Sequence, residues 1–212
     1  HDNEKGELAQ LEYAKKDGVR WKMPAKWYRV DLGGETPLLT LLCLDSNLPA
    51  VSGTGKDKKT GKPRRSLNAD EAAAQIEWLK TELAKPRAPF TLVMAHHPLY
   101  SNGDHGDTKA LLKDWEPLFE KHQVHAYLCG HDHDLQHLEM EGKFTSHILS
   151  GGGGARTRKL ENADRKMPYG QDVHGFTHIS VNMEGLTFSH YGVDGGLLHQ
   201  FTKRRDGKVE MG

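Results

Sequence analysis

The chain has 212 residues, and its 29 Lys and Arg residues balance 29 Asp and Glu residues, so the formal net charge is zero. This balance excludes a global field that would attract nucleic acid or an anionic membrane, and no apolar stretch approaches the length of a membrane span. With 36% hydrophobic residues, the chain can bury the core of one domain but is short for two.

The first part of the chain predicts alternating strand and helix. A continuous apolar run over 37–44 is typical of a strand buried on both faces. The segment 51–66 carries six Lys and Arg residues and predicts a solvated loop, with a basic flap for phosphorylated substrates as the alternative. Asn68 and Glu71 have the spacing of a capping box, which predicts a helix that ends near Ala84.

The next predicted strand ends in histidine. An apolar run begins at Phe90 and leads into His96 and His97, and Pro98 then ends the strand because proline cannot continue a central strand. In open α/β sheets, ligands bind in the crevice beyond the carboxyl ends of the strands. Histidines at this position are therefore candidate ligands.

A second histidine cluster follows, after a polar loop that carries His105 and a predicted helix over about 108–122. A short apolar strand ends at Gly130, and His131 and His133 come directly after it. Residues two apart in extended backbone project to the same face, and glycine permits a sharp turn at the strand end. Because imidazole suits zinc, iron, copper and nickel, we predict that His131 and His133 converge with the earlier histidine on a metal site.

The last third of the chain has period-two patterns and short turns, which predict hairpins. The expected strands are 135–140, 144–149, 176–182, 186–191 and 197–203. Cys43 and Cys129 fall inside apolar strand patterns and are interpreted as buried thiols, with a disulfide as the alternative. The remaining helix and strand histidines are interpreted as structural or surface residues: His122, His125, His137, His147, His178, His190 and His199.

The motifs A-H-H-P-L-Y-S, D-H-G and G-H-D-H-D-L-Q-H, in this order, resemble the C-terminal half of calcineurin-like metallophosphoesterases. They are most similar to the small purple acid phosphatases of the tartrate-resistant type. His1-Asp2 resembles the end of the G-N-H-D/E motif of that family, and the glycine run 150–154 stands where the family has a glycine-rich turn. The resemblance implies an α/β fold of two packed mixed β-sheets flanked by helices, in which 1–212 is the C-terminal portion of a single domain.

The resemblance also implies metal-dependent phosphomonoester hydrolysis of the acid phosphatase type, by hydroxide bound to a dinuclear centre of iron with iron, zinc or manganese. In this family pattern, His96 and His131 ligate one metal and His133 ligates the other. His1 contacts the phosphoryl group and protonates the leaving oxygen, and His105 matches a second histidine outside the metal coordination. Histidine suits proton transfer near neutral pH.

The chain departs from the family pattern in two ways. His97 stands where the family has an aromatic residue, which favours a packing or rim role, and Asp132 and Asp134 are interpreted as supporting or solvated groups. The aspartate, bridging aspartate, tyrosine and asparagine ligands of the N-terminal half are absent from the sequence. We therefore expect the missing N-terminal half of the domain as a partner, and at most one metal bound by this chain alone.

The expected substrate is a phosphorylated small molecule or a phosphoprotein, with neither nucleic acid nor membrane as a partner. The expected location is extracytoplasmic: secreted, periplasmic or lysosomal. Two alternatives stay open: a phosphodiesterase or nucleotidase of the same superfamily, and an inactive metal-binding fragment.

Overall fold

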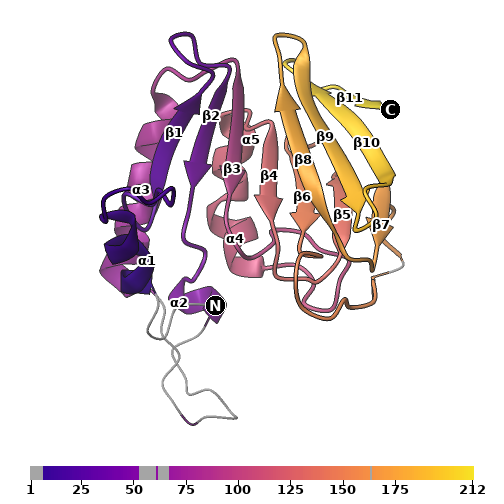
Figure 1. The fold of residues 1–212 in the computed structure, drawn as a ribbon, viewed down its shortest axis with the longest axis horizontal. Helices are drawn as coiled ribbons and strands as arrows, with labels where there is room; N and C mark the ends of the chain where they lie inside the picture. The colour runs from indigo at the N-terminus through magenta and orange to yellow at the C-terminus, as the bar shows by residue number, and fades with distance from the viewer. Residues whose placement is uncertain (1–6, 53–60, 62–66, 163) are drawn as a thin grey trace.

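The fold consists of two β-sheets and a layer of helices, as seen in a computed structural model that describes residues 7–52, 61, 67–162 and 164–212 (Figure 1). The larger sheet has the strand order β1-β2-β3-β4-β6-β5-β7. Its strands are β1 Tyr28–Leu32, β2 Leu39–Cys43, β3 Phe90–Met94, β4 Ala126–Cys129, β5 Leu135–Glu139, β6 Ser146–Ser150 and β7 Tyr169–Gln171. The four strands β2, β3, β4 and β6 are parallel neighbours, and β1, β5 and β7 pair antiparallel at the two sides.

The smaller sheet is wholly antiparallel, with the order β11-β10-β9-β8. Its strands are β8 Gly175–Val181, β9 Gly185–Gly192, β10 Leu197–Arg204 and β11 Val209–Met211. The described helices are α1 Glu7–Ala14, α2 Pro49–Ser52, α3 Ala69–Ala84, α4 Lys109–Asp114 and α5 Glu116–Lys121. None of these helices combines the length and apolarity that crossing a bilayer requires.

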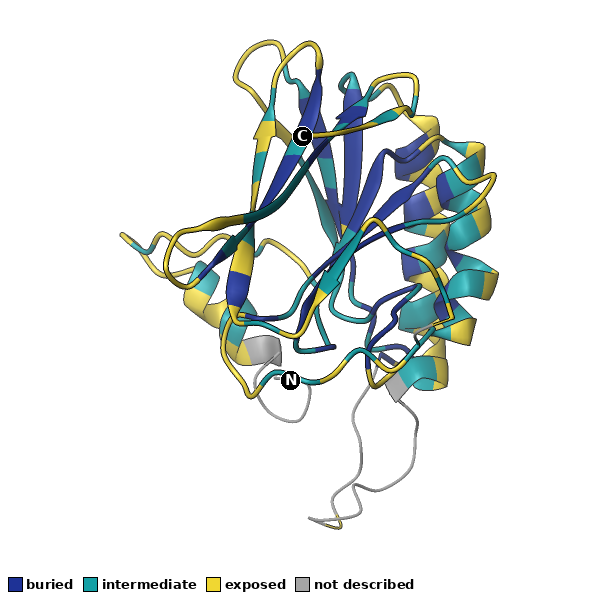
Figure 2. Cartoon of the chain, turned by 90° about the vertical axis from the view of Figure 1, so that its right-hand side faces the viewer, coloured by how far each residue is buried: buried dark blue, intermediate teal, exposed yellow. Residues whose placement is uncertain are grey.

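Two hydrophobic cores lie on opposite faces of the larger sheet (Figure 2). Val93 and Tyr127 face α3, α4 and α5, where they join Leu79, Trp115 and Phe119. The alternate positions of the same strands face the smaller sheet, and this second core consists of Leu39, Phe90, Leu92, Ala126, Ile148, Leu186, Phe188 and Phe201. Burial on both faces explains why the central strands read as continuous apolar runs. The predicted arrangement of two packed sheets with helices is confirmed.

Most of the predicted elements are confirmed, and one helix is corrected. The capping box forms as expected, because the Asn68 side chain accepts from the Glu71 N–H and the Glu71 side chain accepts from the Asn68 N–H. The single helix predicted over 108–122 is two helices that meet at Trp115. Pro117 lies in the first turn of α5, where proline is tolerated, whereas inside one long helix it would remove a hydrogen bond and clash with the preceding turn.

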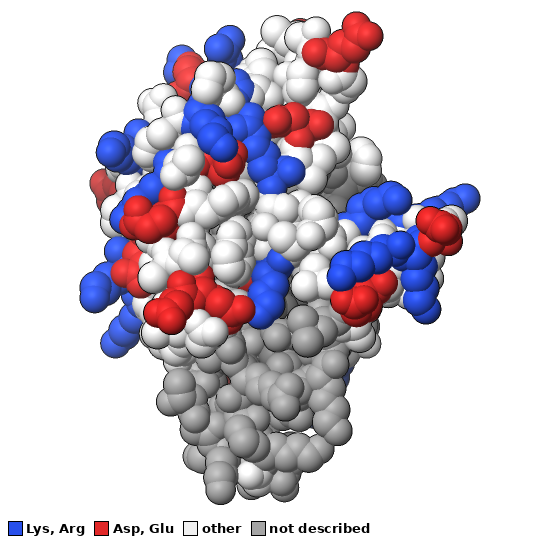
Figure 3. Space-filling view, turned by 90° about the vertical axis from the view of Figure 1, so that its left-hand side faces the viewer, with Lys and Arg blue, Asp and Glu red and all other residues white. Residues whose placement is uncertain are grey.

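The predicted thiols are also confirmed, since Cys43 and Cys129 are free and buried. The basic segment predicted as a loop over 51–66 falls largely outside the described residues, as does His1. On the face that carries β1, α1 and α3, basic and acidic side chains are interspersed, in keeping with the zero net charge (Figure 3).

Three histidines interpreted as scattered structural residues meet between the two sheets. His137 of β5 donates through Nε2 to Glu139 (2.7 Å) and accepts at Nδ1 from His199 Nε2 of β10 (3.0 Å). Tyr169 stacks on His199, with ring centroids 4.8 Å apart, and on His190 of β9 at 5.4 Å. These five residues form the intersheet histidine cluster. Burial lowers the pKa of His190 to about 3 and that of His199 to about 4, and neighbouring imidazoles add to both shifts.

We predict that acidification destabilises the fold through this cluster. The folded-state pKa of His190 lies below the ordinary value of 6.5, so the unfolded chain takes up a proton below about pH 6.5 while the fully buried ring stays neutral. Stability present above pH 6.5 is therefore lost as the pH falls, by roughly 2 kcal/mol for His190 between pH 7.5 and 5. Urea unfolding of the chain at the two pH values measures this loss.

The His190→Phe substitution keeps a ring against Tyr169 and removes the ionisable group, so it should reduce the loss between the two pH values. His178, exposed on β8, supplies the control His178→Ala, which should leave the loss unchanged. An equal pH dependence in the His190→Phe variant would contradict the assignment.

Candidate metal centre

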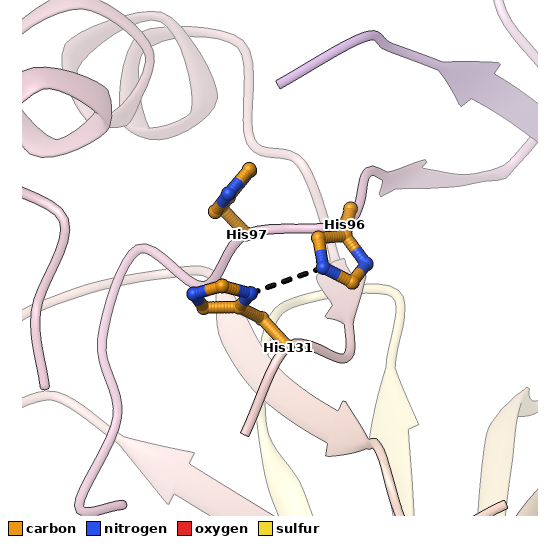
Figure 4. A group of neighbouring side chains, drawn as sticks. All are labelled: His96, His97 and His131. Atoms are coloured by element: carbon orange, nitrogen blue, oxygen red, sulfur yellow. Dashed lines mark hydrogen bonds between the residues drawn. The ribbon is translucent and has the colours of Figure 1, made fainter. Parts of the chain in front are cut away.

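Two histidines meet at the carboxyl ends of neighbouring parallel strands. Met94 of β3 pairs with Leu128 of β4, and the pairing continues past both strands, because the Gly130 N–H donates to the His96 carbonyl at 3.1 Å. The strand ends therefore advance together, and His96 Nε2 lies 3.0 Å from His131 Nδ1 (Figure 4). Residues 35 positions apart in the chain become neighbours at one edge of the sheet.

His97 supplies the third nitrogen of this group. One ring nitrogen from each of His96, His97 and His131 lies within 4.8 Å of the others, and no other group of three His, Cys, Asp or Glu residues in the described parts of the chain is so close (Figure 4). Ser46, which follows β2, holds His97 by accepting from its N–H at 2.9 Å and contacting Nδ1 at 2.8 Å. His97, for which the sequence predicts a packing or rim role, is therefore also a candidate metal ligand.

His133 does not join that group, although the sequence predicts that it converges with His131. His131 adopts φ 70°, in the left-handed region, so the chain leaves the extended conformation there and the two-residue alternation no longer applies. The His133 Nδ1 instead lies 2.9 Å from the Arg156 carbonyl. Donation from Nδ1 to a carbonyl fixes the tautomer and leaves the Nε2 lone pair available, as is usual for a metal-ligating histidine.

His105 lies beside the group, on the loop between β3 and α4. Its ring centroid is 3.9 Å from that of His131. The buried Asp132 carboxylate holds it, because one oxygen accepts from the His105 N–H at 3.0 Å and contacts Nδ1 at 2.6 Å. The other carboxylate oxygen accepts a short hydrogen bond from the Ser101 hydroxyl. The loop of His105 is thereby anchored to the segment between His131 and His133.

Asp134 is a second buried carboxylate at this site, so neither aspartate is solvated. One oxygen accepts from Gln136 at 2.8 Å, and the other has no hydrogen-bond partner among the described residues. Burial raises the pKa of Asp134 to about 7, although the Gln136 hydrogen bond opposes the shift, and Asp132 adds to it. The close packing needs glycine at Gly103, where a Cβ would lie 2.7 Å from Asp134, and at Gly151, where it would lie 1.8 Å from the Asp132 carbonyl.

The three clustered histidines fit a metal ion chemically. Burial lowers the pKa of His96 and of His97 to about 4 and that of His131 to about 2, and mutual repulsion between positive rings adds to the shifts. The rings are therefore neutral at pH 7, as metal ligation requires. Zinc–nitrogen bonds of about 2.0–2.1 Å in tetrahedral geometry place two nitrogens about 3.3–3.4 Å apart, close to the 3.0 Å observed between His96 and His131.

We predict that the 212-residue chain binds one zinc ion through this group. Three imidazoles provide the protein ligands of one open tetrahedral site, and no carboxylate among the described residues joins the three-nitrogen group to bridge a second ion. Elemental analysis after dialysis should give one zinc per chain, and His131→Ala should abolish binding at micromolar zinc. His178→Ala serves as the matched control, and two zinc ions per chain would contradict the prediction.

Comparisons with known proteins identify the family of this chain. The family model of the calcineurin-like phosphoesterases matches residues 1–135. The tartrate-resistant acid phosphatase type 5 of Mus musculus is 31% identical over 206 residues, covering 93% of this chain, and the human protein is 30% identical over the same length. Purple acid phosphatase 7 of Arabidopsis thaliana is 34% identical over 126 residues, covering 58% of this chain and 38% of the relative. The chain spans 62% of the length of the mouse relative and 63% of the human one.

Solved structures show the same fold. The Plasmodium inner membrane complex anchor GAP50 superposes with a TM-score of 0.71 at 21% identity, covering 92% of this chain and 60% of that protein. The yellow lupin purple acid phosphatase PPD1 superposes with a TM-score of 0.62 at 19% identity, covering 85% of this chain and 34% of that protein. The family model covers more than half of the chain, and its residues include the paired strand ends with their histidines. This chain belongs to the calcineurin-like phosphoesterase family.

Proposed function

We propose that the protein is a metal-dependent phosphomonoesterase of the purple acid phosphatase type. The observation that carries the proposal is the convergence of neutral histidines at the ends of β3 and β4, with His105 held beside them. The relatives named acid phosphatases, at about 30% identity over nearly the whole chain, support the same activity. Because the chain spans about three-fifths of their length, the activity is proposed for the protein that carries the complete ligand set.

In this proposal His96 and His131 hold one metal and His133 the other, and His97 lies close enough to contribute to the first. When bound, such a two-metal centre neutralises phosphoryl charge and supplies a strong nucleophile at neutral pH. The protonation state and the orientation of these ligands are set by the protein itself. Burial keeps the rings neutral, and the Arg156 carbonyl and the Ser46 hydroxyl fix the orientation of His133 and His97.

His105 is proposed to contact the phosphoryl group or to transfer a proton to the leaving oxygen. Its Nδ1 is occupied by the buried Asp132 carboxylate, so Nε2, which lies 3.1 Å from Arg158 Nη1, is the ring nitrogen that would face a substrate. The role predicted for His1 lies outside the described residues and stays a prediction.

The remaining metal ligands are proposed to come from protein outside the described residues, as an N-terminal half of the same domain would supply. A cavity of about 520 Å³ adjoins His96. Its lining is largely apolar and includes Trp21, Met23, Tyr28, Met94 and Leu128. Chain packed into this cavity would bury that apolar surface and bring side chains to the open side of His96. We also propose an extracytoplasmic location, on the basis of the similarity to the tartrate-resistant and purple acid phosphatases.

The experiment that tests the function is hydrolysis by the active enzyme of an aryl phosphate monoester against the matching diester. We predict turnover of the monoester that a chelator abolishes and added metal restores. Faster turnover of the diester would favour a phosphodiesterase, and no turnover by the enzyme with its complete ligand set would overturn the proposal.

We predict that His105→Ala in the active enzyme lowers kcat by roughly 10²–10⁴-fold, which is typical for loss of an acid–base group. The metal content should stay unchanged, because His105 lies outside the three-nitrogen group. Steady-state kinetics and elemental analysis of the same preparation measure both quantities. An unchanged kcat would leave His105 without a catalytic role.

A further inference from the structure

The segment after the glycine run contacts two loops of the candidate site, the one that follows β4 and the one that carries His105. The Arg158 N–H donates to the His133 carbonyl at 3.1 Å, and the N–H groups of Glu161 and Asn162 donate to the Asn102 carbonyl at 2.8 and 3.0 Å. We call the described residues of 155–168 the basic strap. These backbone hydrogen bonds hold the basic strap against His133 on one side and against the His105 loop on the other.

Two arginines of the basic strap, Arg158 and Arg165, differ in the groups that their guanidinium nitrogens contact. Arg165 forms a paired contact with Asp107, with nitrogen–oxygen distances of 2.7 and 2.6 Å, and this carboxylate raises the pKa of the Arg165 guanidinium. Such a bidentate pair holds both side chains in one geometry. Arg165 therefore holds the basic strap against the His105 loop, and its guanidinium is already engaged by the Asp107 carboxylate.

The Arg158 guanidinium instead contacts the imidazole of His105. Its Nη1 lies 2.9 Å from Nδ1 and 3.1 Å from Nε2 of His105. The closest carboxylate contact in the described chain is 3.9 Å, from Arg158 Nε to an oxygen of Asp104, whose side chain is half exposed. The positive charge of Arg158 also contributes to lowering the pKa of His131. A partly buried guanidinium thus lies beside the candidate ligands, and no carboxylate of the described residues lies within hydrogen-bonding distance of it.

The position suits a phosphoryl group. A guanidinium matches two oxygens of a phosphate in a bidentate contact, and it is more weakly hydrated than an ammonium. Asp132 already holds Nδ1 of His105, so Arg158 and the Nε2 side of His105 border the same space next to His131. A ligand oxygen placed there would replace His105 Nε2 as the acceptor of a guanidinium N–H of Arg158.

We propose that Arg158 is a phosphoryl-binding residue that selects dianionic phosphate monoesters over singly charged diesters. The proposal rests on the proposed function, since it assigns the substrate class of that same site. The positive charge of Arg158 beside the candidate ligands favours the ester with the larger negative charge. The hydrogen bond from the Arg158 backbone N–H to the His133 carbonyl keeps this residue at the site before substrate binds.

The test is calorimetric titration of inorganic phosphate onto the zinc-loaded chain at constant ionic strength, with zinc content measured in each variant. Arg158→Gln should weaken phosphate binding roughly tenfold to a hundredfold, the usual loss for a hydrogen bond to a charged group. Arg158→Lys keeps the charge but loses the bidentate geometry, so its affinity should fall between the two. Lys159→Gln removes the same charge from the exposed neighbouring position and should bind phosphate like the unsubstituted chain.

Three results would overturn the proposal: unchanged phosphate affinity in Arg158→Gln, equal weakening in Lys159→Gln, or no phosphate binding by the unsubstituted chain. The zinc content separates this failure from failure of the metal centre. If the chain holds zinc and Arg158→Gln binds phosphate normally, only the role of Arg158 is lost. If the chain does not hold zinc, the metal centre fails, and the same titration without zinc still decides whether Arg158 binds phosphate.

Discussion

The parallel pairing of β3 with β4 determines where the candidate metal centre lies. The two strands end at nearly the same level, and the hydrogen bond from Gly130 to the His96 carbonyl extends the pairing beyond the last strand residues. His96 and His131 then have little freedom to separate, because both backbones are held in the sheet. β2 joins the same edge through Ser46, which positions His97. A ligand group built on paired strands is more rigid than one built on loops alone.

Buried carboxylates extend this rigidity to the loops. Asp132 accepts hydrogen bonds from His105 and Ser101, so a single side chain with no exposed surface connects the two segments that approach the site. Replacing Ser101 by alanine would leave one buried carboxylate oxygen unsatisfied, which costs more than one ordinary surface hydrogen bond, whereas the oxygen beside His105 would keep the His105 backbone N–H. Gly103 and Gly151 allow the backbone to come this close, since a Cβ at either position would overlap the Asp132 region.

The sequence alone could predict the strands, the capped helix and the meeting of His96 with His131, because apolar runs and chain order report on burial and strand ends. The role of His97 could not be predicted, since it depends on Ser46, 51 residues away in the chain. The positive φ of His131 was also hidden, because histidine enters the left-handed region only in a few contexts. The break between α4 and α5 was visible as Pro117, whose helix-breaking effect outweighs the apolar periodicity around it.

The intersheet histidine cluster has a consequence for how the two sheets are aligned. Apolar side chains alone would tolerate small sliding movements of one sheet over the other, because the buried area changes little with such a shift. The hydrogen bond between His137 and His199 does not tolerate them, since a displaced ring would leave a buried nitrogen without a partner. A few polar contacts inside an apolar layer thus select one alignment among several of similar buried area, and the smaller sheet is locked in place against the face opposite the helices.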